Sequence, residues 1–99
     1  MSNAVMFISF KLVDGASVQD FLLAAEKLNG SFLSKQKGYI SWKQLVDKDL
    51  WVDFITWETM EDAQNAMKAS EMDAGTPEYM AFIDGESVKY HLFAVERSY

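Results

Sequence analysis

The chain has 99 residues, of which 49% are apolar and 14% aromatic, and its net charge is −6. This length and composition predict one globular domain over residues 1–99, with a core in about residues 5–96. The acidic balance argues against a nucleic-acid partner, which requires clustered Lys and Arg. With no cysteine and a single histidine, we expect no disulfide and no metal site.

The sequence also argues against a membrane partner. No apolar run reaches the roughly 20 residues that a membrane-spanning helix needs. The residues before Lys11 carry no positive side chain, whereas signal peptides begin with a charged segment. We therefore expect a cytoplasmic protein.

The first part of the chain shows a strand pattern followed by a helix pattern. Over residues 5–13 every second side chain is aliphatic or aromatic and would lie on one side of an extended chain, which is typical of a β-strand. Asp14-Gly15 favours a turn after it. Residues 17–20 resemble a capping box. Apolar residues then recur every three or four positions over residues 18–32, which predicts an amphipathic helix. Gly38 is placed to end this segment.

The second part of the chain predicts three more strands and another helix. Residues 39–46 and 50–57 have strand composition and are separated by a short polar turn, which indicates a hairpin. A second capping pattern at residues 59–62 begins a shorter helix. The segment 71–86 is irregular, and residues 87–96 form a last strand.

The order of these elements is β-α-β-β-α-β. It predicts an α+β, ferredoxin-like fold in which both helices cover one face of a four-stranded antiparallel sheet. Alternation along the strands assigns each side chain to a face. To the helix-covered face we assign Met6, Ile8, Phe10, Leu12, Leu50, Val52 and Phe54. To the opposite face we assign Phe7, Ser9, Lys11, Trp51, Asp53, Ile55, Trp57, Lys89, His91, Phe93 and Val95.

This opposite face holds more aromatic and aliphatic residues than a monomer usually exposes. We therefore expect a second copy of the same sheet to cover it across a twofold axis. Two curved sheets packed in this way would form a dimeric α/β barrel. Its lumen would have the concave, mostly apolar character of a small-molecule site.

Several short motifs carry a family resemblance. The most specific is residues 53–59, DFITWET, followed by Glu-Asp-Ala at 61–63; Gly38-Tyr39 and residues 82–84 support it. The chain resembles the dimeric α/β-barrel superfamily, specifically the small antibiotic-biosynthesis-monooxygenase-like (ABM domain) proteins, over roughly residues 5–96. The resemblance implies a homodimer with a ligand-sized cavity. As in some relatives, it also implies oxygenation of polycyclic phenols or quinones without a cofactor.

Asp53 and His91 are the candidate catalytic residues. Asp53 lies in the middle of a strand, where a carboxylate is costly unless it is paired or hydrated. It could be a general base with a raised pKa, it could form a structural ion pair with Lys11 or Lys89, or it could pair across the dimer. The unperturbed pKa of a histidine side chain lies near neutrality, so His91 could accept a phenolic proton, or it could be a structural residue. Similar chains often have a histidine one position later, where this sequence has Leu92.

Five aromatic residues are candidates for substrate binding. Trp57 could form a wall of the cavity or belong to a buried interface. Trp42 and Tyr39 could line the mouth or pack against the partner. Tyr79 and Phe82, in the irregular segment, could form a lid over the opening or belong to the core.

Two functions are consistent with these features. The first is a homodimer that handles a small molecule, in its most concrete form a cofactor-independent monooxygenase-like enzyme acting on an aromatic or phenolic substrate in the barrel lumen. The alternative is a non-catalytic dimeric module that binds a ligand or a partner.

Overall fold

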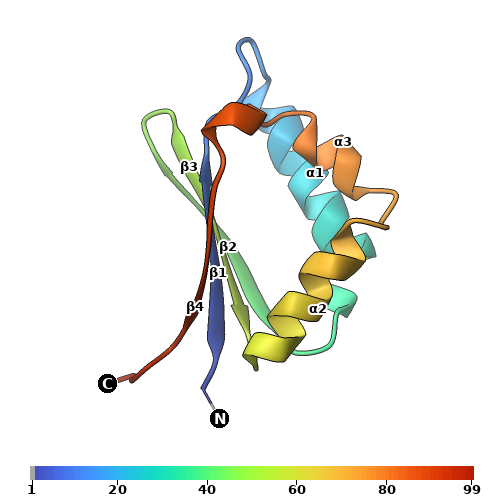
Figure 1. Cartoon of the computed structure of the whole chain (residues 1–99). Coiled ribbons are helices and arrows are strands. Elements are labelled where there is room, and N and C mark those ends of the chain that lie inside the picture. The colour runs from blue at the N-terminus through green and yellow to red at the C-terminus, as the bar shows by residue number, and fades with distance from the viewer. Residues whose placement is uncertain (1) are drawn as a thin grey trace.

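The computed structural model describes residues 2–99 and contains a four-stranded antiparallel sheet with helices on one face (Figure 1). The predicted fold class is confirmed. The elements are β1 (Ala4–Phe10), α1 (Val18–Ser31), β2 (Tyr39–Asp47), β3 (Leu50–Trp57), α2 (Met60–Ser70), α3 (Thr76–Met80) and β4 (Lys89–Ala94). Short 3-10 helices cover Leu33–Lys35 and Gly85–Ser87. Helix α3 lies within the segment 71–86, which the sequence predicts to be irregular apart from a possible extra turn at Tyr79.

Both long helices begin where the sequence places their caps. The hydroxyl of Ser17 accepts a hydrogen bond from the backbone N–H of Asp20 at 3.1 Å, and Thr59 does the same for Asp62 at 3.0 Å. Each cap satisfies an N–H that the first helical turn leaves without a partner. No helix within residues 2–99 is long and apolar enough to cross a membrane.

The strand order in the sheet is β2-β3-β1-β4, so β4 forms one edge and β2 the other. Helices α1, α2 and α3 lie on the same side of this sheet, and its other side carries no helix (Figure 1). We call this uncovered side the open face. The core therefore lies between the sheet and the helices. Its largest fully buried side chains are Trp57, Phe10 and Phe21.

The predicted faces of β3 are wrong. Strand β1 pairs with β3 so that Ile8 lies opposite Asp53 and Met6 opposite Ile55, and directly paired residues share a face. The helix-covered face of β3 consequently carries Trp51, Asp53, Ile55 and Trp57, whereas Val52 and Phe54 point to the open face. Both alternating sets of β3 are rich in apolar residues, so hydrophobic pattern alone does not determine the phase. The register with β1 does.

The predicted faces of β1 and β4 agree with the register. His91 pairs with Phe7, and Phe93 pairs with Val5, on the open face. Strand β2 contains a bulge between Tyr39 and Ser41. Because of this extra residue, Tyr39 and Trp42 both point toward the helices although their spacing is odd.

Candidate functional site

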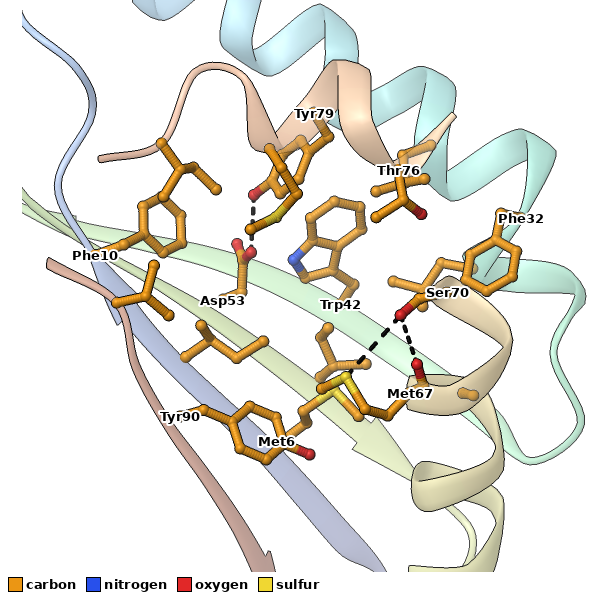
Figure 2. Close-up of a pocket in the computed structure, with 18 of the residues that line it drawn as sticks. Met6, Phe10, Phe32, Trp42, Asp53, Met67, Ser70, Thr76, Tyr79 and Tyr90 are labelled. Atoms are coloured by element: carbon orange, nitrogen blue, oxygen red, sulfur yellow. Dashed lines mark hydrogen bonds between the residues drawn. The ribbon is translucent and has the colours of Figure 1, made fainter. Parts of the chain in front are cut away.

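A cavity of about 550 Å³ lies between the sheet and the helices of a single chain. This volume is typical of pockets that hold small organic molecules. The cavity is on the helix-covered side of the sheet. The predicted phase of β3 would instead have placed Asp53 and Trp57 on the open face, in the lumen of a dimer. The walls of the cavity are mostly apolar and come from every strand and from α1, α2 and α3 (Figure 2). The side chains with polar atoms among the lining residues are Trp42, Asp53, Trp57, Ser70, Glu71, Thr76, Tyr79 and Tyr90.

One side of the cavity meets solvent. Tyr90 on β4 and Met80 on α3 are 40% and 44% exposed, and Glu71 after α2 is also exposed. These three residues come from different elements and all line the cavity. The opening therefore lies between the edge strand β4 and the ends of α2 and α3.

Asp53 is the most deeply buried charged residue of the site, with 4% of its surface exposed. Its Oδ2 accepts a hydrogen bond of 2.8 Å from the phenol of Tyr79. The Tyr79 oxygen in turn accepts a bond of 3.2 Å from Nε2 of Gln44. A hydrogen-bonded chain thus joins β2, α3 and β3 at the cavity wall.

Of the alternatives for Asp53, the ion pair with Lys11 or Lys89 is not formed within the chain. Lys11 instead lies 3.6 Å from the exposed carboxylate of Asp49, and Lys89 is on the open face. The partner of Asp53 is a neutral phenol. No cation from residues 2–99 therefore neutralises the negative charge of Asp53.

Burial raises the pKa of Asp53 from 3.8 to about 6. The hydrogen bond from Tyr79 opposes this rise, with smaller opposing effects from Trp42 and Gln44. Burial also raises the pKa of Tyr79, and the nearby charge of Asp53 raises it further. Tyr79 therefore stays protonated and remains a donor, while Asp53 titrates close to the range in which a general base works at neutral pH.

Three buried polar atoms near the cavity have no hydrogen-bond partner within the part of the chain that the structure describes. They are Oδ1 of Asp53 and the indole nitrogens of Trp42 and Trp57. The indole nitrogen of Trp42 faces the Asp53 carboxylate (Figure 2). Buried polar groups normally find partners, and the N–H of Trp42 that faces this carboxylate is one of the groups that lower the pKa of Asp53.

Four of the predicted site residues come together in the cavity: Asp53, Trp42, Trp57 and Tyr79. Tyr39 does not line it. Its ring packs edge-on against Trp57 at 6.0 Å, and its hydroxyl donates to Asn29.

The other two predicted residues also lie outside the cavity. Phe82 packs against Phe21 in the core at 6.0 Å. His91 is on the open face, where its ring stacks on Phe93 at 5.6 Å. The sheet therefore separates the two candidate bases, and only Asp53 has access to the cavity.

Sequence reasoning missed Gln44, which holds Tyr79, and the residues of α2 and α3 that close the cavity, such as Met67 and Met80. Gln44 is two positions from Trp42, so the period of the strand places it on the same face. Met67 carries no comparable signal. No three His, Cys, Asp or Glu side chains among residues 2–99 lie together as a metal site would require.

Comparison with known proteins finds the same architecture in several solved structures. The sequence matches no protein-family model, and no curated protein is similar to it in sequence. A mutant of SnoaB, a cofactor-independent oxygenase from Streptomyces nogalater, superposes with a TM-score of 0.79 at 12% identity, covering 99% of this chain and 97% of that one.

Two further structures extend this likeness. A proposed antibiotic biosynthesis monooxygenase from Nitrosomonas europaea superposes with a TM-score of 0.71 at 13% identity, over 96% of this chain and 91% of that one. A second, from Bacillus cereus, has a TM-score of 0.67 at 21% identity, over 100% and 96% of the two chains. The chain therefore has the fold of the antibiotic-biosynthesis-monooxygenase-like proteins, over its whole length, as the sequence resemblance predicted.

Proposed function

We propose that the protein is a cofactor-independent monooxygenase-like enzyme that oxidises a phenolic aromatic compound in the cavity between its sheet and its helices. The observation that carries this proposal is the buried carboxylate of Asp53, whose Oδ1 accepts no hydrogen bond from residues 2–99 and whose pKa is raised to about 6 by burial. A base of this kind can remove a proton from an acidic aromatic compound near neutral pH. The likeness to SnoaB supports the same chemistry, although that likeness extends only to the fold.

The reaction can be written for anthrone, which tautomerises to a phenol. Oδ1 of Asp53 takes a proton from the substrate, leaving a carbanion that is delocalised over the rings. The carbanion is oxidised by dioxygen, a C–O bond forms, and the product is a carbon-bound peroxide that takes up a proton. Loss of the remaining hydrogen on that carbon then breaks the O–O bond. The products are the quinone and one water, so the substrate loses two hydrogens and gains one oxygen atom.

The walls of the cavity suit the other requirements of this reaction. Trp42 and Trp57 provide flat apolar surfaces for the rings of the substrate. The apolar lining also limits the water around the carbanion, which water would otherwise quench. Tyr79 holds Oδ2 of Asp53, so the free oxygen keeps one orientation.

The test is aerobic oxidation of anthrone by the wild type, by Asp53→Asn and by His91→Ala. We expect Asp53→Asn to lower the rate by about 10² to 10⁴, the usual contribution of a general base. His91→Ala is the matched control because His91 lies on the open face, and it should keep the wild-type rate. Equal rates in the wild type and Asp53→Asn would refute the role of Asp53. Binding of anthrone without any oxidation would favour the alternative of a non-catalytic binding module.

We also propose that the protein is a homodimer in which two open faces pack together. Phe7 on this face contacts Phe54 and Phe93 edge-on, at 6.4 and 6.5 Å between ring centres. Phe93 nevertheless stays 51% exposed. A second copy would cover this aromatic cluster and remove apolar surface from water.

Native mass spectrometry tests the dimer directly, because the expected mass is twice the 11.3 kDa of one chain. Phe93→Asp should shift the protein toward the monomer, since two copies would then place carboxylates against an apolar surface. Leu23→Asp is the matched control: Leu23 is similarly exposed, at 58%, but it lies on α1. A wild-type monomer, or a Phe93→Asp dimer as stable as the wild type, would contradict the proposed interface.

A further inference from the structure

The phenol of Tyr79 has little freedom apart from the direction of its O–H bond. Its ring stacks on Phe21 of α1 at 5.1 Å and meets the ring of Trp42 edge-on at 5.5 Å. The side chain is buried. Because close packing holds the ring from two sides, the phenol oxygen keeps its position, and only rotation about the C–O bond changes where its hydrogen points.

Two neighbours determine the direction of this O–H bond. Oδ2 of Asp53 lies 2.8 Å from the phenol oxygen and accepts its hydrogen (Figure 2). Nε2 of Gln44 lies 3.2 Å from the same oxygen and donates to it. A phenol has one hydrogen to donate and can accept in return. The N–H of Gln44 therefore occupies the accepting side of the oxygen and leaves the hydrogen directed at Asp53.

The direction of the phenol hydrogen decides how Asp53 can carry a proton. If that hydrogen turned away from Asp53, the phenol oxygen could accept a bond from a protonated Oδ2 instead. The hydrogen would then point at the N–H of Gln44, and two donors would face each other without an acceptor. Gln44 therefore disfavours protonation at Oδ2, and Oδ1 is left as the oxygen that binds a proton.

Gln44 acts from outside the ligand site. It pairs directly with Asp53 across β2 and β3, and directly paired residues share a face. It does not line the cavity, although Tyr79 and Asp53 both do. Together with Trp42 it instead lines a smaller hollow between α1 and β2. A role for Gln44 must therefore act through the side chains that it contacts.

We propose that Gln44 is a positioning residue: by donating to Tyr79 it keeps the phenol hydrogen on Oδ2 of Asp53, so that the proton from the substrate is bound and released at Oδ1. This inference deepens the proposed function and rests on it, because Oδ1 is the oxygen to which that reaction assigns the proton. How Asp53 binds a proton can nevertheless be measured without any substrate. The hydrogen bond from Gln44 is also one of the causes that lower the pKa of Asp53, which agrees with this role.

Removing the donor should add a second protonated form of Asp53. In Gln44→Met, which keeps a similar side-chain length but has no N–H, the phenol can turn and accept from Oδ2. A second form of equal energy doubles the affinity for the proton. A ¹³C NMR titration of the Asp53 carboxyl group should therefore give a pKa at least about 0.3 higher than in the wild type. An unchanged or lower pKa would overturn the proposal.

Two further variants assign this effect to the contact between Gln44 and Tyr79. Gln36→Met is the matched control, because Nε2 of Gln36 also donates across 3.2 Å, but to the backbone oxygen of Phe32. It should leave the titration of Asp53 as in the wild type, and an equal rise there would overturn the assignment. In a Tyr79→Phe background no phenol oxygen remains, so Gln44→Met should lose most of its effect. An equal effect in both backgrounds would overturn the proposal, because Gln44 would then act on Asp53 without the phenol.

The pH dependence of anthrone oxidation gives a separate measurement. The acid limb of kcat/KM reports the base of the free enzyme, so in Gln44→Met it should move to higher pH by the same amount as the NMR titration. A loss of rate that is equal at every pH would indicate a structural role alone and overturn the proposal. A shifted titration in a protein that does not oxidise anthrone would leave the role of Gln44 standing and refute the proposed reaction. Oxidation with an unshifted titration would have the opposite meaning.

Discussion

The phenol of Tyr79 on α3 donates a 2.8 Å hydrogen bond to Oδ2 of Asp53 in the middle of β3. This bond holds one carboxylate oxygen, whereas the other, Oδ1, has no hydrogen-bond partner in the described part of the chain. The bond also ties α3 to the sheet. The ring of Tyr79 stacks on Phe21 of α1 at 5.1 Å, so the same side chain contacts a second helix. A single contact therefore links the packing of the helices to the chemistry of the site.

The pKa of Asp53 makes the stability of the fold depend on pH. In the folded protein this pKa is about 6, against 3.8 in the unfolded chain, so the folded state binds the proton more tightly. The stabilisation is fully present below about pH 4 and is lost as the pH rises through about 6. A change of about two pKa units corresponds to about 3 kcal/mol.

Asp53→Asn removes this titration. Between about pH 4 and pH 8, the free energy of unfolding of the variant should therefore rise relative to the wild type by up to about 3 kcal/mol. Urea unfolding at a series of pH values measures the difference. Asp49→Asn, at an exposed ion pair, should shift stability by at most about 1 kcal/mol. A difference between Asp53→Asn and the wild type that is the same at every pH would contradict the raised pKa.

Tyr79→Phe deletes the donor but keeps the ring. The hydrogen bond lowers the pKa of Asp53, so its removal should move that pKa above about 6, which a ¹³C NMR titration of the Asp53 carboxyl group can follow. At about pH 8 the variant should lose about 1.5–3 kcal/mol of stability, as for a hydrogen bond to a charged group. The loss should be smaller at about pH 4.

Tyr39→Phe is the matched control for that experiment. It also removes a phenol donor, but the acceptor is the neutral side chain of Asn29, at 3.0 Å. We expect a loss of about 1 kcal/mol that does not vary with pH. An unchanged Asp53 pKa in Tyr79→Phe would show that the phenol does not tune the carboxylate.

Gly38 is required at the start of β2. Its φ is +82°, and a Cβ at this position would collide with the side chain of Asp62 at the start of α2. Gly38→Ala should therefore cost at least about 2 kcal/mol, from backbone strain together with the clash. Gly30→Ala in α1 is the control, because a Cβ there meets nothing and should stabilise the helix by about 0.5–1 kcal/mol. Thermal unfolding measures the expected loss of stability in Gly38→Ala and the expected gain in Gly30→Ala. A Gly38→Ala variant as stable as the wild type would contradict this account.

The volume of the cavity can be tested from α2. Ala66 lines the cavity, whereas Ala63, one turn earlier on the same helix, is fully buried in the core and does not line it. Ala66→Leu should extend into the cavity and weaken binding of anthrone, measured under nitrogen, by at least about tenfold, with a stability change below about 1 kcal/mol. Ala63→Leu should instead overpack the core and cost about 1–3 kcal/mol. Tight binding by Ala66→Leu would mean that the ligand lies elsewhere.

Local sequence patterns were enough to predict the four strands and two long helices and their order. Periodicity and caps are local signals, so Ser17 and Thr59 mark the helix starts, and the alternation of residues marks the strands. These local patterns, together with the motif at residues 53–59, also predicted the fold that the solved structures share. Asp53, Trp42, Trp57 and Tyr79 could be named as candidates because a carboxylate or a large ring is conspicuous in its segment.

The directions in which those side chains point depend on contacts between distant parts of the chain. The phase of β3 depends on its register with β1, because both of its alternating faces are apolar and burial is equally favourable for either. The partner of Asp53 comes from α3, 26 residues further along the chain, at a distance that no local pattern spans. The position of the cavity, and the separation of His91 from it by the sheet, follow from these long-range contacts.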